Sequence, residues 1–342
     1  MIGDVLLTTP VLTALKRRYP GCHLALLTDG LAAELVKGHP AIDDLIVYNT
    51  NTGKQKFTFS DLTRHFKVLN YIRRQKFDLA INLHPSARGG RAVKWSGAEC
   101  RVGYDARGKN NKYYNVLVPD DGGVDRYRVD YLLDPLRALG IDVEVELPTL
   151  GISEEDRQAV RQYLEAGQGP LIVLHPGRTD TPKSWKDDRF ASLADALVVQ
   201  YGVRLIFIGA PSEADRVDSI MSMMRQPSMS LAGKLGLRHV GALLEGADLF
   251  IGIDSSPLHI ASAVGTPTIA LFGPSDTTKW NPPGPNHICI QKRFDKHPNC
   301  LPHNCWKTNC SPCMSNIQVG DVLAEVEKVI PLSVENKQGI GL

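Results

Sequence analysis

The chain has 342 residues, of which 43% are hydrophobic and 22% charged, and its formal net charge is +2. This is the composition of a folded globular protein long enough for two domains. No apolar run approaches the roughly 20 residues of a membrane-spanning helix, and Asp4 interrupts the first apolar residues, which argues against a signal peptide; we therefore expect a cytoplasmic protein.

Strands alternate with helices almost throughout, which predicts an α/β protein with parallel sheets. The chain passes from Met1 straight into its first helix, so the strand that normally precedes such a loop is missing. Either the start codon is assigned downstream of the true one, or the first domain tolerates an empty central strand position. We favour the former, because an empty position leaves backbone groups unpaired. In the first half, helices are predicted at 9–19, 31–37, 60–75 and 127–139, and strands at 23–27, 45–48 and 78–83.

Asp4, in the segment GDVLLTTP, is a lone carboxylate at the start of the first helix. An acid at this position often only stabilises the helix dipole. The alternative is a general base that removes a proton from an acceptor hydroxyl.

Residues 54–112 hold 14 Lys and Arg against 4 Asp and Glu. Such a charged segment is either a solvated face or the contact surface for an anionic partner. A phosphorylated glycan or an acidic lipid headgroup fits better than nucleic acid, because no aromatic-studded platform accompanies the charges.

The second half repeats the alternation, and the two halves meet near 147–153, so we expect domains at 1–148 and 149–342. Predicted strands are 171–174, 203–208, 249–253 and 268–272, and predicted helices are 187–200, 212–224, 237–245 and 258–264.

Polar loops follow the first two strands of the second half. The loop 175–185 carries Arg178, Thr179 and Lys183, which are suited to holding a diphosphate and neutralising charge on a leaving group. A solvated basic loop is the alternative. The loop 209–213 ends in Ser212 and Glu213, and Glu213 either binds ribose hydroxyls or is an ordinary acid at a helix start.

The segment 248–276 is typical of a complete strand, helix and strand unit that binds a nucleotide sugar. Its first strand stops at Asp254, Ser255 or Ser256 can cap the helix, and Pro257 suits the first helical turn. The positive end of that helix should face the carboxyl edge of a parallel sheet, with His259 in its first turn. A purely structural turn is the alternative, but the density of polar groups favours a functional site.

Other motifs are missing from the chain. It has no GxxxxGK[ST] loop and no GxGxxG after a strand, which disfavours a P-loop NTPase and an NAD enzyme, and it has no HExxH motif.

The segment 297–313 contains four cysteines, Cys300, Cys305, Cys310 and Cys313, and two histidines, His297 and His303. Reduced structural thiols, a metal site and disulfide pairing all remain open for this cluster.

An ordered set of motifs resembles the ADP-heptose:lipopolysaccharide heptosyltransferases, glycosyltransferase family 9. The motifs are GDVLLTTPVLTALKRRYP at the start, FDLAINL at 77–83, RVGY at 101–104, HPG at 175–177 with KSW at 183–185, SLAGK at 230–234, and FIGID at 250–254 continued directly by SSPLHIASAVGTPTIALFGPSD at 255–276. The opening, SLAGK and the segment 254–259 look most like the heptosyltransferase III type, which decorates an inner-core heptose.

The resemblance implies a GT-B fold, with two Rossmann-like domains whose parallel sheets face each other across a cleft. It further implies an inverting transfer of heptose from ADP-heptose to a hydroxyl of the anionic lipopolysaccharide inner core, without a metal or another cofactor. The first domain would bind the acceptor and the second the donor. Such an enzyme would work in the cytoplasm, in peripheral contact with the inner membrane, and would not bind nucleic acid.

Residue by residue, Asp4 matches the catalytic aspartate of the family and Lys183 the lysine at the donor diphosphate. Ser256 departs from a glycine that is frequent at its position. The implied donor-binding residues are Arg178, Thr179, Lys183, Ser212, Glu213, Asp254, Ser255, Ser256, Pro257 and His259, and the basic segment suggests Lys54, Arg64, Arg88, Arg91 and Arg101 for the acceptor.

Two other functions stay open at this point. One is a glycosyltransferase or an epimerase that uses a different nucleotide sugar. The other is a nucleotide-sugar-binding protein whose first domain does not catalyse.

Overall fold

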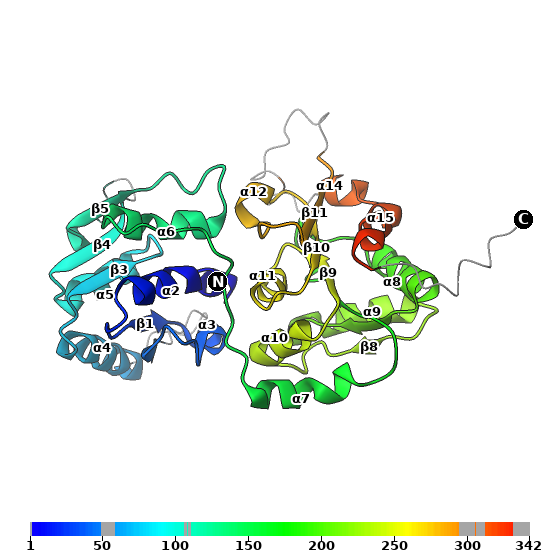
Figure 1. Ribbon diagram of the computed structural model, residues 1–342, viewed down its shortest axis with the longest axis horizontal. Helices are drawn as coiled ribbons and strands as arrows, with labels where there is room; N and C mark the ends of the chain where they lie inside the picture. The colour runs from blue at the N-terminus through cyan, green and yellow to red at the C-terminus, as the bar shows by residue number, and fades with distance from the viewer. Residues whose placement is uncertain are drawn as a thin grey trace, which may run out of the picture. The chain divides into compact units, whose positions relative to one another are not determined.

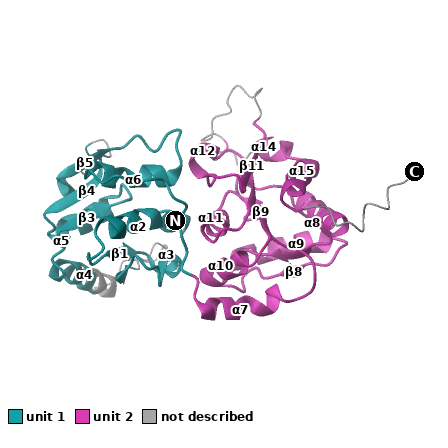
Figure 2. Ribbon diagram, in the orientation of Figure 1, with its two compact units in different colours: residues 1–151 teal, residues 152–342 magenta. Residues whose placement is uncertain are grey.

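The computed structural model describes residues 2–48, 59–105, 108, 111–293, 305 and 312–330. It divides into two compact units, residues 1–151 and 152–342 (Figure 2). The division lies three residues beyond the one drawn from the sequence.

Unit 1 alternates helices and short strands (Figure 1). Pro10 lies in the first turn of α2, Asp29 caps α3 by accepting a hydrogen bond from Ala32 N–H, and Ser86 caps α5 in the same way through Gly89 N–H. Its elements are α1 Ile2–Leu6, α2 Thr9–Arg18, β1 Ala25–Thr28, α3 Gly30–Val36, β2 Asp44–Val47, α4 Phe59–Arg74, β3 Leu79–Asn82, α5 Ala87–Ser96, β4 Cys100–Asp105, the 3₁₀ turn η1 Asn111–Tyr113, β5 Val116–Pro119 and α6 Arg128–Ala138.

The described strands of unit 1 form two separate parallel sheets. One contains β1 and β2, and the other has the order β3-β4-β5. No described strand joins β1 to β3. The sheet that the sequence predicts is therefore interrupted between these two strands.

Unit 2 contains one six-stranded parallel sheet in the order β11-β10-β9-β6-β7-β8. Its elements are α7 Glu154–Leu164, β6 Leu171–His175, α8 Asp187–Tyr201, β7 Arg204–Phe207, the 3₁₀ turn η2 Pro211–Glu213, α9 Ala214–Met223, β8 Met229–Ser230, α10 Leu237–Glu245, β9 Leu249–Ile253, α11 Ser256–Ala263, β10 Thr268–Phe272, α12 Thr277–Trp280, β11 His287–Gln291, α14 Pro312–Asn316 and α15 Val319–Val329.

Helices cover both faces of this sheet. Alternate residues of the central strands, such as Ile172, Leu174 and Ile251, belong to a core shared with α8, α9 and α15. Because side chains of a strand alternate between faces, Val173 and Phe250 point to the other face, where α11 contacts β9 and β10 and packs beside α10. Strands β6, β9 and β10 are buried along their whole length.

Most predicted elements are present, with small shifts at their ends. The strand predicted at 23–27 begins later, at Ala25, and the helix predicted at 212–224 divides into η2 and α9. The helix predicted from 258 already begins at Ser256. The sequence interpretation missed α5, β4, β5, α7, β8, α12, β11, α14 and α15.

Candidate functional site

Three polar loops follow neighbouring strands of unit 2. Strand β6 pairs with β7 on one side and with β9 on the other, and all three run parallel. Their carboxyl ends therefore lie at the same edge of the sheet. The loops are 176–186 after β6, 208–213 after β7, which includes η2, and 254–255 between β9 and α11.

Lys183 and Asp254 join two of these loops. The Lys183 Nζ lies 2.5 Å from Asp254 Oδ2 and donates a second hydrogen bond of 3.2 Å to the Asp254 carbonyl. Asp254 is 5% exposed, so its carboxylate is held next to a cation where water is largely excluded. The sequence interpretation placed both residues in the donor site, and the structure brings them into contact.

A buried histidine at the end of β6 contacts a residue after β7 and a residue after β9. His175 Nε2 lies 3.2 Å from Glu213 Oε2, and His175 Nδ1 lies 3.0 Å from Ser255 Oγ. Burial by itself raises the pKa of Glu213, but hydrogen bonds from His175 and from Ala210 N–H outweigh it and hold the pKa below its usual value. Glu213 is therefore ionised at neutral pH, and the tautomer with a proton on His175 Nε2 fits the contact.

Two residues outside the predicted site residues fix the shape of the loop after β6. Gly177 has a φ of +73°, and a Cβ there would lie 2.2 Å from the Cδ1 of Ile253, so only glycine fits. Arg216, 8% exposed, donates hydrogen bonds to the carbonyls of Pro176 and Trp185, at the two ends of the loop. Arg216 also pairs with the carboxylate of Asp187, at 2.7 Å. Its two partners in the loop are main-chain carbonyls, for which the sequence carries no signal.

The amino end of α11 differs from the predicted capping. Ser255 is the residue before the helix, but its hydroxyl contacts His175 and the Ile253 carbonyl and makes no capping bond. Pro257 has no N–H, and Leu258 N–H donates to the Ser255 carbonyl at 3.1 Å. The donors that such a helix start leaves for an anion are the N–H groups of Ser255 and Ser256. His259 is 4% exposed, and its ring packs 6.2 Å from that of Trp280.

The other predicted donor residues lie in the same loops but on the surface. Arg178 forms a two-bond ion pair with Asp180, in which both side chains are 61% exposed. Thr179 and Ser212 are exposed. Gly233 N–H, in the SLAGK segment, donates a hydrogen bond of 2.8 Å to the Gly209 carbonyl. This segment therefore lies beside the loop that contains Glu213.

In unit 1, Asp4 lies in the first turn of α1, is half-buried and lines a cavity of about 1760 Å³. Arg88 and Arg91, both exposed on α5, line the same cavity. The guanidinium of Arg101 instead donates to the carbonyls of Tyr113 and Ala98, which ties it to the protein's own backbone.

The side chains of the other two residues predicted to bind the acceptor are not described. Arg64 belongs to α4, and Lys54 lies outside the described residues.

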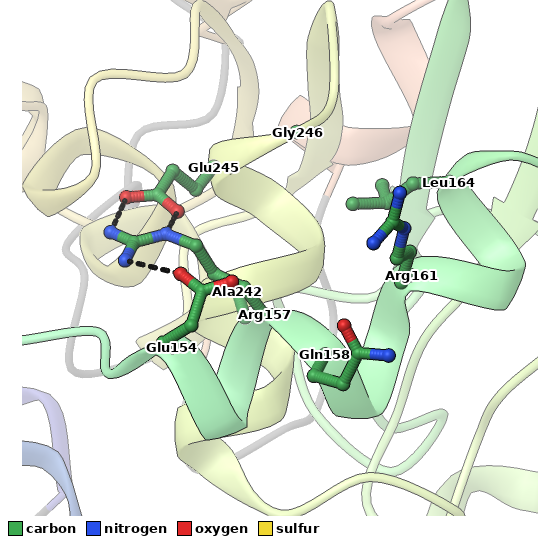
Figure 3. A pocket seen from close by; sticks show the side chains of 8 residues that line it. All are labelled: Glu154, Arg157, Gln158, Arg161, Leu164, Ala242, Glu245 and Gly246. Carbon is green, nitrogen blue, oxygen red and sulfur yellow. Dashed lines mark hydrogen bonds and ion pairs between the residues drawn. The ribbon is translucent and has the colours of Figure 1, made fainter.

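A separate shallow pocket of about 230 Å³ lies between α7 and α10 (Figure 3). Arg157 makes two hydrogen bonds to the Glu245 carboxylate, at 2.7 and 2.9 Å, and reaches Glu154 at 3.7 Å. The pair between Arg157 and Glu245 joins the two helices, which is a structural role.

The cysteine-rich segment is only partly described. Cys305 and Cys313 are buried, whereas Cys300, Cys310, His297 and His303 lie outside the described residues, so the three alternatives for this cluster remain predictions. Burial, with a smaller contribution from Asp254, raises the pKa of the Cys289 thiol to about 12.

Within the described ranges, no three His, Cys, Asp or Glu side chains form a group that could hold a metal ion. No helix in these ranges has the length and apolarity to cross a membrane.

Residues 65–308 match the model of glycosyltransferase family 9 (heptosyltransferase). The chain is 30% identical, over 340 residues, to lipopolysaccharide heptosyltransferase 3 of Escherichia coli, and the alignment covers 97% of each protein. Its structure is similar to that of a family 9 glycosyl transferase from Veillonella parvula, with a TM-score of 0.81, 24% identity and coverage of 96% and 94%. It is also similar to the E. coli heptosyltransferase WaaC with ADP-2-deoxy-2-fluoro heptose, with a TM-score of 0.73, 19% identity and coverage of 96% of each chain. These likenesses confirm the predicted GT-B fold class.

Proposed function

The chain belongs to glycosyltransferase family 9, the heptosyltransferases, and we propose that it transfers a heptose from ADP-heptose to a hydroxyl of the lipopolysaccharide inner core. The match to lipopolysaccharide heptosyltransferase 3 over 97% of both chains carries this proposal. The comparisons give no support to an epimerase or to another donor.

The polar edge of unit 2 is the donor site in this proposal. Lys183 and the N–H groups of Ser255 and Ser256 would bind the diphosphate, where the cation and the helix dipole both favour negative charge. Glu213, held by His175, would accept hydrogen bonds from the ribose hydroxyls. Asp254 would accept hydrogen bonds from the heptose, and Arg178, Thr179, Ser212, Pro257 and His259 would line the rest of the site.

Asp4 is the proposed general base. Its carboxylate would take the proton of the acceptor hydroxyl, whose oxygen forms a bond to the anomeric carbon while the bond from that carbon to the diphosphate oxygen breaks. The electron pair of the broken bond leaves with ADP, and attack from the opposite side inverts the anomeric centre.

We propose that the transfer needs no metal ion. The leaving diphosphate gains negative charge, and a fixed cation together with oriented N–H groups can stabilise that charge. Lys183, placed by its contact with the buried Asp254, is the cation for this role.

We place the enzyme in the cytoplasm, in peripheral contact with the inner membrane. The support is the basic character of α4 and α5, on which Lys67, Arg73, Arg88, Arg91 and Lys94 are exposed. Clustered cations of this kind attract anionic glycans and lipid headgroups.

Purified enzyme with ADP-heptose and a series of lipopolysaccharides truncated at successive inner-core positions tests the proposal. We expect ADP release with one truncated acceptor and none without an acceptor. Release of ADP that is independent of every acceptor, or conversion of the nucleotide sugar alone, would contradict it.

A further inference from the structure

The loop after β10 lies at the same edge of the unit 2 sheet as the proposed donor site. Strands β9 and β10 run parallel, and Ile253, the residue before Asp254, pairs with Leu271. The carboxyl ends of both strands therefore meet at this edge. Residues 273–276 follow β10 there and lead into α12, which ends at Trp280. None of these residues has a place in the proposed donor site.

The order of the strands sets the order of the loops along this edge. Across the sheet, β7, β6, β9 and β10 follow one another. Glu213, proposed for the ribose, follows β7, whereas Lys183 and Ser255, proposed for the diphosphate, follow β6 and β9. From the loop after β7 to the loop after β9 is two strand spacings, about 9.6 Å. A nucleotide sugar that runs from ribose to diphosphate in this direction next meets the loop after β10.

The side chain of Trp280 reaches from this loop to the start of α11. The centres of the Trp280 and His259 rings lie 6.2 Å apart, and the rings are tilted by 55°. His259 is in the first turn of α11, and helical side chains point back toward the amino end. The two rings therefore meet beside the N–H groups proposed to bind the diphosphate. His259 is buried, whereas Trp280 is half-buried and keeps ring surface that a ligand can cover.

Hydrogen bonds on both sides of α12 hold the ring in place. Before the helix, Gln291 Nε2 donates to the carbonyls of Gly273 and Ser275, at 2.8 and 2.9 Å. After the helix, Asn281 Nδ2 donates to the His287 carbonyl at 3.0 Å. Gln291 and His287 both belong to β11, so the sheet itself positions this short segment. A ligand can meet a ring held in this way at little cost in ordering.

We propose that Trp280 is the sugar platform of the donor site, a ring surface that packs against the C–H face of the heptose of ADP-heptose. A pyranose carries hydroxyls at its rim and C–H groups on its faces, so its site needs an apolar surface beside polar groups. Asp254 supplies the polar group, and the indole supplies a large apolar surface. The cation of Lys279, 5.8 Å from the ring centre, borders the same surface. The inference rests on the proposed function, in which ADP-heptose is the donor.

Calorimetric titration of two ligands separates a sugar contact from support of the fold. We expect Trp280→Leu to raise the Kd of ADP-heptose about fivefold or more, the loss of one aromatic contact, while the Kd of ADP stays within about twofold. Trp280→Phe keeps an aromatic face and should retain most of the affinity. Thr278→Ala, at an exposed position of the same helix, is the matched control and should change neither Kd. Equal losses for the two ligands in Trp280→Leu, or no loss for either, overturn the proposal.

Fluorine NMR on the protein with Trp280 in place does not depend on how well Trp280→Leu folds. The chain has four tryptophans, and after labelling with fluorotryptophan the signal of Trp280 is the one that Trp280→Phe removes. We expect this signal to shift when ADP-heptose replaces ADP in the site. A signal that is the same with both ligands overturns the proposal.

ADP-glucose, titrated in the same way, distinguishes failure of the proposed donor from failure of this inference. If the enzyme transfers no heptose but Trp280→Leu weakens the binding of ADP-glucose and not that of ADP, the donor is wrong and the sugar platform stands. If heptose is transferred and Trp280→Leu binds ADP-heptose as tightly as the parent enzyme, the donor is right and the sugar platform is wrong.

Discussion

The ammonium group of Lys183 lies 2.5 Å from a carboxylate oxygen of Asp254, a residue that is 71 positions away in the chain and 5% exposed. The contact fixes a cation at the carboxyl edge of the unit 2 sheet. In the proposed reaction this cation meets the diphosphate, and Asp254 keeps it in place before the donor arrives.

Replacing this cation should weaken donor binding and slow the transfer. We expect Lys183→Met to lower kcat/KM by about a hundredfold or more, the usual effect of removing one stabilising group from a leaving-group site, and to raise the Kd of ADP. Lys186→Met is the matched control, because Lys186 is an exposed lysine three residues away. Steady-state kinetics and calorimetric titration of ADP check both variants; unchanged ADP affinity in Lys183→Met would remove the lysine from the donor site.

Substitution of Asp4 tests the base. We expect Asp4→Asn to reduce transfer by about a thousandfold, because the amide cannot take the acceptor proton, while the Kd of ADP-heptose stays within twofold. Asp142→Asn, at an exposed position of the same unit, should keep full activity. A fully active Asp4→Asn enzyme excludes this residue as the base.

His175 can be tested by two amides of different length. The amide nitrogen of His175→Gln can replace Nε2 and keep the contact with Glu213, whereas that of His175→Asn can replace Nδ1 and keep the contact with Ser255. One lost hydrogen bond is worth about 1 kcal/mol, or roughly fivefold. We therefore expect His175→Asn mainly to raise the Kd of ADP and His175→Gln mainly to lower kcat. Identical losses in both parameters for both variants would show that the histidine only supports the fold.

Sequence reasoning reached the unit 2 site because its signals are local. Strands such as β9 are unbroken apolar runs, and the polar residues that follow them, Asp254 among them, stand at predictable strand ends. Strand β4 was missed because Arg101 and Asp105 interrupt its apolar pattern.

Other parts of the site depend on contacts across long stretches of chain. Arg216 closes the loop after β6 through two carbonyl groups, and a carbonyl is common to every residue. The contacts of His175 were missed because its partners, Glu213 and Ser255, are 38 and 80 residues away. Ser255 or Ser256 was expected to cap α11; Ser255 stands at the capping position but makes no capping bond, because its hydroxyl contacts His175.

Stability below neutral pH should depend on Asp156. Burial alone raises its pKa, but hydrogen bonds from Arg238 and from Ser153 lower it far below the usual value. A carboxyl whose pKa is depressed by folding stabilises the protein above its unfolded pKa, near 3.9, and this stabilisation is lost as the pH falls through the folded pKa. Asp156→Asn should therefore cost roughly 3 kcal/mol at pH 7, with a difference from the parent protein that shrinks below about pH 4.

The exposed neighbour Glu155 provides the control, since it lies in the same first turn of α7. Glu155→Gln should change the free energy of unfolding by less than about 0.5 kcal/mol. Urea denaturation of the three proteins between pH 3 and pH 7 measures the differences. A constant gap between Asp156→Asn and the parent over this range would contradict the assignment of the low pKa.

The close approach of Gly177 to Ile253 predicts a loss that a second substitution can partly reverse. A Cβ at residue 177 would lie 2.2 Å from Ile253 Cδ1 and 3.0 Å from its Cγ1, and the φ of +73° adds backbone strain. Gly177→Ala should destabilise the protein by about 2 to 3 kcal/mol and raise the Kd of ADP. Ile253→Val removes the Cδ1 atom and alone should cost about 1 kcal/mol. In the double variant the collision is relieved but the strain stays, so its loss should be at least about 1 kcal/mol smaller than the sum of the single losses. Urea denaturation of the four proteins measures this coupling, and strictly additive losses would show that the loop moves away from Ile253 without resistance.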